Sequence, residues 1–415
     1  MTTDLQVNQE IFAGMEYFSN EQRLAELADF FQLDTRRVLF GDGALSALGA
    51  ECERLDARRV VLVRDADIKP LETAVAEVLH QAGIELVDVY TDIVPNPTIE
   101  SVDRFVAYAN GVECDAFVAL GGGSTMDTAK TGLCVATAGG SVTDYFGFEL
   151  FSEPARWPLI GIPTTAGTGA EVSRGAVFVA KDGKKGVMSE KQWPRVAIVD
   201  PQLSASMPPL LTAVTGLDAI GHALECTASK KSTPVGDAVA REALKAGCPH
   251  FERAVKRGAA DPEARHQMAL CSMLAGFLLS HINTGAGHAL GYGIENVSKE
   301  KGKPVPHGAA VALLLPGVMR HNLPEVVEKY YYAAGVAGLD LGGKSIEEGA
   351  RSMARWVDDL RKRHTPFASL VASGLAAEDI PRMVEIGMSV DRLLDQNPVK
   401  LEMENAVAIY REILN

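Results

Sequence analysis

The sequence lacks the features that mark membrane, secreted and nucleic-acid-binding proteins. No stretch of its 415 residues approaches 18 uninterrupted apolar residues, and the N-terminal MTTDLQVNQEIF has neither the basic segment nor the apolar core of a signal peptide. Lys and Arg number 40 against 54 Asp and Glu, a net charge of -14 that argues against a phosphate-backbone partner. We expect a cytoplasmic protein that binds neither membranes nor nucleic acid.

Cysteine is also sparse, and no CxxC pair occurs. The six cysteines stand singly, mostly in apolar or helical runs, and isolated thiols of this kind are typical of reduced cytosolic cores. We expect the following residues to be free thiols: Cys52, Cys114, Cys134, Cys226, Cys248 and Cys271.

Up to about residue 205 the sequence alternates between short strand-like runs and longer helix-like runs. ARRVVLVRDADI and IELVDVYTDI have the apolar, β-branched composition of strands, while LETAVAEVLHQAG and IESVDRFVAYANG have helical spacing. This alternation is the signature of βαβ units on a parallel sheet. We therefore predict an α/β dinucleotide-binding domain over residues 36–205.

The flanking segments have a different composition. After a proline-rich break near residue 205, long stretches rich in Ala, Leu and Met predict an all-helical second domain over residues 206–415. Residues 1–35 are polar and partly helical in pattern, and we interpret them as an N-terminal extension suited to subunit contact. With 47% hydrophobic residues, the chain can bury two ordinary cores.

A glycine-rich turn joins a buried strand to a helix in CDAFVALGGGSTMDTAK. Gly121, Gly122 and Gly123 let the backbone approach an anion, and the helix that follows offers unpaired N–H groups and the positive end of its dipole. These features predict a pyrophosphate site. The alternative is a tight turn that needs glycine for its backbone angles, and Met126 stands where a full GxGxxG motif has its third glycine.

Two further features bear on the cofactor. The loop IPTTAGTGAEVSR at residues 162–174 also follows an apolar strand, and its threonines can line the same nucleotide, although an ordinary loop is the alternative. Asp65 ends the strand VVLVRDA, where a carboxylate accepts both ribose hydroxyls of NAD and repels the 2′-phosphate of NADP. Arg64 beside it keeps NADP open, since a guanidinium can receive that phosphate. The alternative for Asp65 is a solvated turn.

Four potential metal ligands stand in the second half of the chain. Asp218 and His222 are four residues apart in TGLDAIGHALE, a segment of helical pattern, so both side chains leave one face about a turn apart. His288 and His307 follow in GAGHALGYG and PVPHG. The spacing permits one divalent ion. The alternative is that Asp218 caps a turn while each histidine is an ordinary core or surface residue.

In this order, the motifs GGGSxxDxAK, PTTAGTGxE, the DxxxH pair, the later HA and the PHG resemble the iron-dependent (group III) alcohol dehydrogenase family over residues 36–415. The resemblance implies a dehydroquinate synthase-like fold, in which the α/β domain faces the helical domain and Fe2+ or Zn2+ lies in the cleft. The family motif GxDAxxHxxE is also matched at Glu225. The implied metal ligands are Asp218, His222, His288 and His307.

The resemblance also implies a lysine near the cofactor, which Lys185 in KDGKKG matches, although a solvated hairpin turn explains the same residue. We expect NAD, with NADP as the second option. The expected contacts are Asp65, Asn96, Gly121, Gly122, Gly123, Ser124, Asp127, Thr164, Thr165, Thr168, Val172 and Lys185.

The chain departs from the family pattern at three places. Tyr292 replaces the second histidine of HAxxH, so we expect it either to relay a proton or to pack in the core. The run NVSKEKGKPV lengthens the segment before His307. Arg174 is similar to the branch that oxidises the terminal hydroxyl of 3-deoxy-octulosonate, and a guanidinium there suits a substrate carboxylate or phosphonate. A structural salt bridge is the alternative for Arg174.

The implied activity is hydride transfer between NAD(H) and a small alcohol or aldehyde whose oxygen is bound by the metal. An acidic sugar, or another alcohol bearing a carboxylate or phosphonate, is the alternative substrate. A dehydroquinate synthase-type cyclase is the alternative enzyme, and a nucleotide-sensing or assembly protein is the alternative outside enzymes. A homodimer or a higher homo-oligomer is expected.

Overall fold

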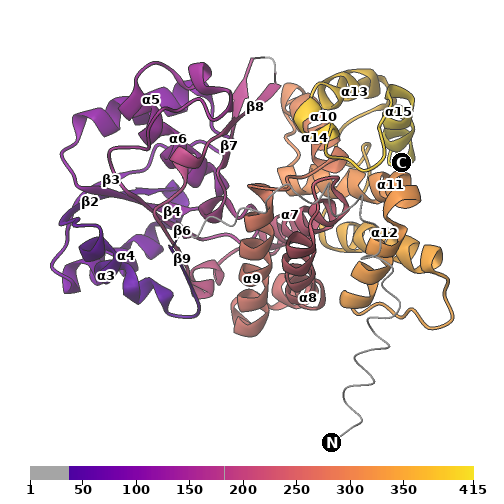
Figure 1. Cartoon of the computed structure of the whole chain (residues 1–415), viewed down its shortest axis with the longest axis horizontal. Coiled ribbons are helices and arrows are strands. Elements are labelled where there is room, and N and C mark those ends of the chain that lie inside the picture. The colour runs from indigo at the N-terminus through magenta and orange to yellow at the C-terminus, as the bar shows by residue number, and fades with distance from the viewer. Residues whose placement is uncertain (1–36, 182) are drawn as a thin grey trace, which may run out of the picture. The chain divides into compact units, whose positions relative to one another are not determined.

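The computed structural model describes residues 37–181 and 183–415 (Figure 1). The N-terminal extension predicted at residues 1–35 lies outside the described residues, so its role stays a prediction. Within the described part, strands and helices alternate as far as Val199, and only helices follow from Pro209 onward. These two residues lie on either side of the expected change near residue 205.

The first half is built on a six-stranded sheet of order β1-β9-β6-β4-β2-β3, in which every neighbouring pair is parallel. The prediction of a parallel α/β sheet is therefore confirmed. Its strands are β1 (Arg37–Phe40), β2 (Arg59–Arg64), β3 (Glu85–Tyr90), β4 (Ala116–Gly121), β6 (Leu159–Pro163) and β9 (Val196–Val199).

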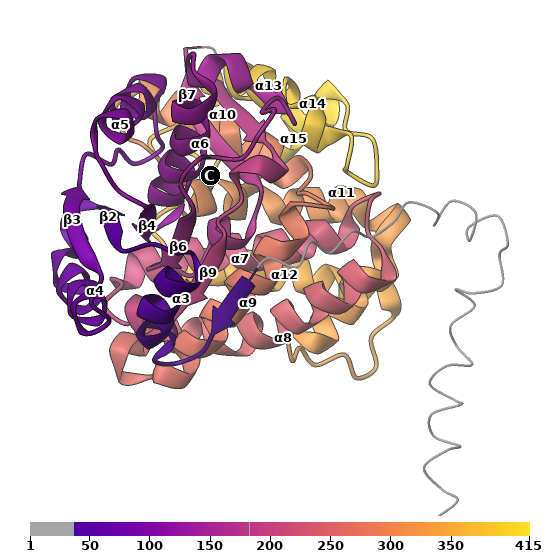
Figure 2. The same cartoon turned by 60° about the vertical axis from the view of Figure 1, so that its left-hand side comes forward.

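Helices cover both faces of this sheet (Figure 1, Figure 2). Successive residues of a strand point to opposite faces, so Leu62 of β2 packs in one core with Leu79, while Val63 packs in another with Phe105. The helices on the first face are α3 (Leu48–Arg54) and α4 (Lys69–Gln81), and those on the second are α5 (Ile99–Gly111) and α6 (Gly123–Ala138).

A second, three-stranded sheet of order β5-β8-β7 was not predicted. It contains β5 (Gly147–Phe148), β7 (Gly175–Ala180) and β8 (Gly183–Met188), with β7 and β8 antiparallel. Lys184 and Lys185 therefore lie in a strand rather than in a solvated turn. Because side chains alternate along a strand, these two lysines point to opposite faces.

The second half is helical, as predicted. Helices α7, α8 and α9 each have a proline in the first turn, where its missing N–H costs no hydrogen bond, and the side chains of Thr233 and Asp261 cap α8 and α9. The helices are α7 (Pro209–Ala228), α8 (Pro234–Arg257), α9 (Pro262–Leu279), α10 (Ala286–Glu300), α11 (His307–Val336), α12 (Ile346–His364), α13 (Ile380–Met388), α14 (Asp391–Leu394) and α15 (Met403–Glu412).

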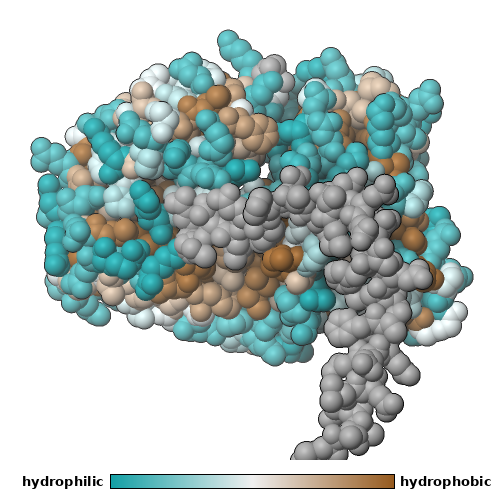
Figure 3. Space-filling view, viewed as in Figure 1, coloured by the Kyte–Doolittle hydropathy of each residue, from teal (hydrophilic) through white to brown (hydrophobic). Residues whose placement is uncertain are grey.

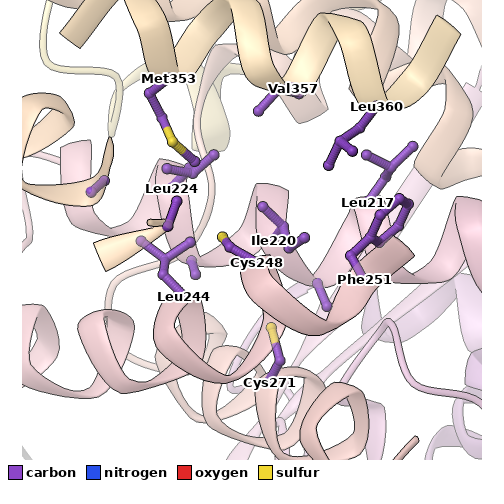
Figure 4. Close-up of a cluster of buried hydrophobic side chains, with 14 of the residues drawn as sticks. Leu217, Ile220, Leu224, Leu244, Cys248, Phe251, Cys271, Met353, Val357 and Leu360 are labelled. Carbon is purple, nitrogen blue, oxygen red and sulfur yellow. The ribbon is translucent and has the colours of Figure 1, made fainter. Parts of the chain in front are cut away.

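Helix α7 is almost completely buried, and one of its sides forms the centre of a large core (Figure 4). Leu217, Ile220 and Leu224 pack there with side chains of α8 and α12. All six cysteines are free and all but Cys114 are buried, so the expectation of core thiols is confirmed.

Within the described residues, no helix combines the length and the hydropathy that crossing a bilayer requires. The face in Figure 3 is largely hydrophilic, with hydrophobic patches between polar side chains. Exposed large hydrophobic residues are spread over separate elements, such as Phe148 in β5 and Tyr332 in α11. Scattered apolar residues of this kind are normal on a protein surface and do not by themselves mark a binding site.

Candidate active site

The carboxyl end of the parallel sheet brings together the two segments predicted to bind a nucleotide. After β3 the chain returns to the other side of β2 and continues there as β4, so the winding of the sheet reverses between β2 and β4. Ligands of open α/β sheets bind at this point. Asp65 follows β2 and Gly122 follows β4, which places the predicted ribose and phosphate contacts side by side.

The glycine turn leaves room for a close approach of backbone. No side chain caps the start of α6, so the N–H groups of its first turn face outward without a side-chain partner. A Cβ atom at Gly121 would stand 2.8 Å from Oδ2 of Asp65, and one at Gly123 would stand 2.9 Å from Cγ2 of Thr168. Glycine is therefore required here for packing, and the binding of an anion at this turn stays a prediction.

The Thr-rich loop lies between the sheet and the helical half. The Thr164 N–H donates to the Gly121 carbonyl at 3.0 Å, and a Cβ at Gly122 would stand 3.3 Å from the Thr165 side chain. On its other side, a Cβ at Gly167 would stand only 2.7 Å from Thr215 of α7. Val172, also predicted as a cofactor contact, is buried in a small core beside α9. The Thr-rich loop thus connects the predicted nucleotide site with helix α7.

Asp65 and Arg64 have distinct partners. The Thr125 hydroxyl donates to Oδ2 of Asp65 at 2.9 Å; burial raises the pKa of this carboxyl, and that hydrogen bond opposes the rise. Arg64 is largely buried and donates through Nε to Glu72 at 2.5 Å and through Nη1 to the carbonyls of Asp65 and Ala66. Arg64, the residue that could have bound the 2′-phosphate of NADP, therefore already has partners within the protein.

Three further predicted cofactor residues organise the loops. Asn96 has a positive φ of 53°, and its N–H donates to the Ser124 hydroxyl at 3.1 Å. Asp127 accepts the Val177 N–H at 2.9 Å, which ties α6 to β7. Buried Lys130, one turn on, donates to the carbonyls of Ala170, Ser173 and Gly175. Asp127 therefore has an internal structural contact, and its contact with the cofactor stays a prediction.

Three imidazoles converge on one carboxylate oxygen in the helical half. The Nε2 atoms of His222, His288 and His307 lie 3.6, 3.5 and 3.7 Å from Oδ1 of Asp218. Ligands about 2.1 Å from a central ion stand about 3.4 Å apart at a tetrahedral angle, close to these three separations. The helical spacing of Asp218 and His222 explains one pair, and the packing of α11 on α7 and of α10 on α11 supplies the others.

The donor atoms fit a divalent cation. Oδ1 of Asp218 and Nε2 of His288 are buried without a hydrogen-bond partner, a costly condition that a cation would relieve. Ligand atoms of Asp218, His288 and His307 all lie within 4.8 Å of one another, whereas His222, which stacks on His288, is outside this mutual set. One oxygen and several imidazole nitrogens suit Fe2+ or Zn2+.

The protonation states differ among these residues. Burial lowers the pKa of His222 to about 4. Burial also disfavours charge on His288, but the carboxylates of Glu225 and Asp218 outweigh it and raise the pKa of His288 to about 10. Burial would raise the pKa of Asp218, yet the surrounding histidines hold it well below its usual range. Asp218 is therefore ionised, as a metal ligand must be.

Two buried carboxylates orient the histidines from behind. Glu225 contacts Nδ1 of His288, and Oε1 of Glu295 lies 2.7 Å from Nδ1 of His307. Such contacts fix the tautomer and leave Nε2 for an ion. Oε2 of Glu295 also accepts from Nζ of Lys184 at 2.5 Å. Burial disfavours the charge of Glu295, but its contacts with Lys184 and His307 outweigh burial and lower its pKa to about 2.

Sequence reasoning missed Lys184 and Glu295. Glu295 lies two helical turns beyond His288 on the same face of α10, a spacing that could have identified it. Lys184 projects from β8 over the ring of Tyr292, with Nζ 5.2 Å from the ring centroid. Lys184 is therefore the lysine beside the predicted metal ligands, whereas the strand turns Lys185 to the opposite face. The contact of Lys185 with the cofactor stays a prediction.

Tyr292 and Arg174 lie in different surroundings. The buried Tyr292 ring stands 5.8 Å from the His307 ring, next to the metal ligands. Arg174 pairs with Glu149 at 3.2 Å and with Glu190 at 3.6 Å. Arg174 thus forms the structural salt bridge that was its alternative interpretation.

Known families match both halves of the chain. A family described as iron-containing alcohol dehydrogenase matches residues 35–201, and its C-terminal counterpart, described as Fe-containing alcohol dehydrogenase family, C-terminal, matches residues 212–414. The chain belongs to the iron-containing alcohol dehydrogenase family. The resemblance inferred from its motifs is confirmed.

Individual members of the iron-containing alcohol dehydrogenase family are similar over nearly the full chain. A choline dehydrogenase of Bacillus subtilis is 35% identical over 91% of this chain and 93% of its own. A crystal structure of 1,3-propanediol oxidoreductase has a TM-score of 0.84 at 31% identity, covering 92% of this chain and 100% of its own. A sulfoacetaldehyde reductase from Bifidobacterium kashiwanohense, solved with NAD+, has a TM-score of 0.78 at 28% identity, covering 92% and 99%.

We expect Glu295→Gln to weaken metal binding by roughly ten- to a hundredfold, because the carboxylate behind His307 is lost and buried Lys184 is left without its counter-charge. The measurement is the dissociation constant of Zn2+ by competition with a chelator. Glu300→Gln, on an exposed position of the same helix, is the matched control. Equal affinities for the two variants would contradict the role of Glu295.

Glu171, in the Thr-rich loop, generates a prediction for pH. Its side chain is buried, and burial raises its pKa to about 7. A backbone hydrogen bond and the charge of Lys130 oppose this rise without cancelling it. Since the pKa is higher in the folded state, the contribution to stability is full below about pH 4.5 and is lost as pH rises to 7.

We therefore expect Glu171→Gln to gain stability over the wild type by roughly 2 kcal/mol more at pH 8 than at pH 5. Urea unfolding of both proteins at the two pH values measures this difference. A stability difference that does not change with pH would show that Glu171 is ionised throughout.

Proposed function

We propose that this chain is an NAD(H)-dependent dehydrogenase that interconverts a small alcohol and its aldehyde at a divalent metal, Fe2+ or Zn2+. The observation that carries the proposal is the convergence of three imidazole Nε2 atoms on the buried, unpaired Oδ1 of Asp218. The Thr-rich loop that packs on the glycine turn also packs on Thr215, one turn before that aspartate.

The chain's own residues have separate roles in this chemistry. When bound, the metal supplies Lewis acidity toward the substrate oxygen and NAD supplies a hydride acceptor. Asp218, His222, His288 and His307 would hold the ion. The glycine turn and the Thr-rich loop would hold the dinucleotide, while burial of the ligands keeps bulk water away. The Tyr292 ring packs 5.8 Å from the His307 ring and its hydroxyl lies 3.4 Å from Nη2 of Arg392, so its contacts favour packing beside the ligands over relaying a proton.

The surroundings of Asp65 favour NAD over NADP. A carboxylate after β2 suits the two ribose hydroxyls and repels a 2′-phosphate. Arg64, the residue that could receive that phosphate, is engaged by Glu72 and by backbone carbonyls. The NAD+ complex of the similar sulfoacetaldehyde reductase supports the same choice.

The alternatives have less support. The similar proteins described above are named as dehydrogenases, oxidoreductases or reductases, which favours a dehydrogenase over a cyclase. The buried ligand set argues against a nucleotide sensor without chemistry. The substrates in these names are a cation, a neutral diol and an anion, so relatedness leaves the charge of the substrate open. A homo-oligomer in the cytoplasm stays a prediction.

We expect Asp218→Asn to lower turnover by about a thousandfold or more, since the transition-state stabilisation supplied by a metal is lost. Bound metal, measured by elemental analysis, should fall in parallel, whereas NAD binding measured by calorimetry should persist. Asp359→Asn, at an exposed position of α12, is the control. Full activity and full metal content in Asp218→Asn would disprove the metal assignment.

We expect Asp65→Ser to shift the cofactor preference toward NADP, because the variant loses the acceptor of the ribose hydroxyls and the repulsion of the 2′-phosphate. The KM for NAD should rise by roughly tenfold, the effect of losing hydrogen bonds to a charged group. Steady-state kinetics with both cofactors measure the shift, with Asp67→Ser as a nearby control. An unchanged ratio would show that Asp65 does not contact the ribose.

A further inference from the structure

Arg392, in the short helix α14, lies next to Tyr292, which in turn packs beside the predicted metal ligand His307. Its Nη2 lies 3.4 Å from the Tyr292 hydroxyl, and the Tyr292 ring stands next to the His307 ring. A Cβ at Gly186 of β8 would be 3.6 Å from Nε of Arg392. The guanidinium therefore lies where the helical half meets strand β8, beside the predicted metal site.

The charge of Arg392 is not neutralised within the described residues. Among residues 37–181 and 183–415, no carboxylate lies within 4.0 Å of this guanidinium, and its one side-chain hydrogen bond there is the long contact with Tyr292. The neighbouring cations differ, because Lys184 pairs with Glu295 and Arg174 pairs with Glu149. A half-buried guanidinium with free donors is suited to an anionic ligand.

The side chains of Arg392 and Tyr292 favour one of the three possible substrate charges, which are cationic, neutral and anionic. A planar guanidinium binds a carboxylate through two parallel hydrogen bonds, and the Tyr292 hydroxyl can donate a third. A quaternary ammonium group would meet Arg392 and Lys184 without a free carboxylate to balance it. A neutral diol would leave Arg392 uncompensated.

We propose that Arg392 and Tyr292 form a subsite for the carboxylate of the substrate, so that the preferred alcohol carries its reacting hydroxyl at one end and an anionic group at the other. This inference rests on the proposed function, which places the hydroxyl end at Asp218 and its histidines. Arg392 is thus a specificity-determining residue, and the role first considered for Arg174 belongs to a different arginine.

The test compares substrates that differ in one group. The metal-loaded enzyme is assayed with 3-hydroxypropionate, 4-hydroxybutyrate and 5-hydroxypentanoate and with the diols of matching length, in which a hydroxymethyl group replaces the carboxylate. We expect the wild type to have the higher kcat/KM for the acids. In Arg392→Gln the ratio of acid to diol should fall roughly ten- to a hundredfold, and Arg392→Lys should restore part of it.

Two controls separate the subsite from folding and from the dehydrogenase itself. Arg355→Gln removes a positive charge from an exposed position of α12 and should leave the ratio unchanged. Calorimetric binding of butyrate to the holoenzyme should be weaker in Arg392→Gln than in the wild type, and thermal melting checks that the variants fold.

The outcomes are distinguishable. Equal losses for acids and diols in Arg392→Gln, or a wild-type preference for the diols or for choline, would overturn the subsite while leaving the dehydrogenase in place. Turnover of neither acids nor diols would contradict the proposed function. Even if the enzyme turns over neither acids nor diols, butyrate binding that does not depend on Arg392 would overturn the subsite.

Discussion

The buried carboxylate of Asp218 is the constraint on which the rest of the structure depends. An ionised oxygen with no hydrogen-bond partner is stable in an interior only when cations or a metal face it, and the three imidazole Nε2 atoms around Oδ1 of Asp218 are the donors that would hold a metal there. Both sides of helix α7 are buried. One side packs into the apolar core around Ile220, and the other carries the predicted metal ligands Asp218 and His222. A Cβ at Gly308 would collide with the Val214 carbonyl, so glycine there lets α11 bring His307 close.

The sheet half and the helical half meet around this carboxylate through two contacts of different kinds. The Thr-rich loop packs by shape, since glycine at position 167 allows it to touch Thr215. Lys184 instead joins by charge, pairing with Glu295, which in turn orients His307. The orientation of a metal ligand is thus linked to a strand next to the nucleotide-binding segments, which suits a reaction that needs cofactor and metal together.

Three cationic side chains near β8 differ in how their charges are paired. Lys184 lies in β8, and Arg174 and Arg392 lie near that strand. Within the described residues, Lys184 and Arg174 have carboxylate partners and Arg392 has none. Family membership sets the reaction class, because the ligands and loops supply it. The unpaired guanidinium is a local feature, and such features decide which of several chemically similar alcohols a common scaffold accepts.

Local pattern in the amino-acid sequence was sufficient to predict the parallel sheet, the helical half, the two loops that follow strands β4 and β6, and the proximity of Asp218 and His222. Periodicity and short motifs report neighbours along the chain. Local pattern was not sufficient to place Lys184 beside the metal ligands, since the direction of a side chain on a strand depends on the register of that strand with β7. Nor could local pattern identify the contact of Glu295 with His307 or that of Arg392 with Tyr292. The same holds for the salt bridges of Arg174 with Glu149 and Glu190. Those pairs join segments far apart in the chain, and only the packing of helices and strands determines which distant charges meet.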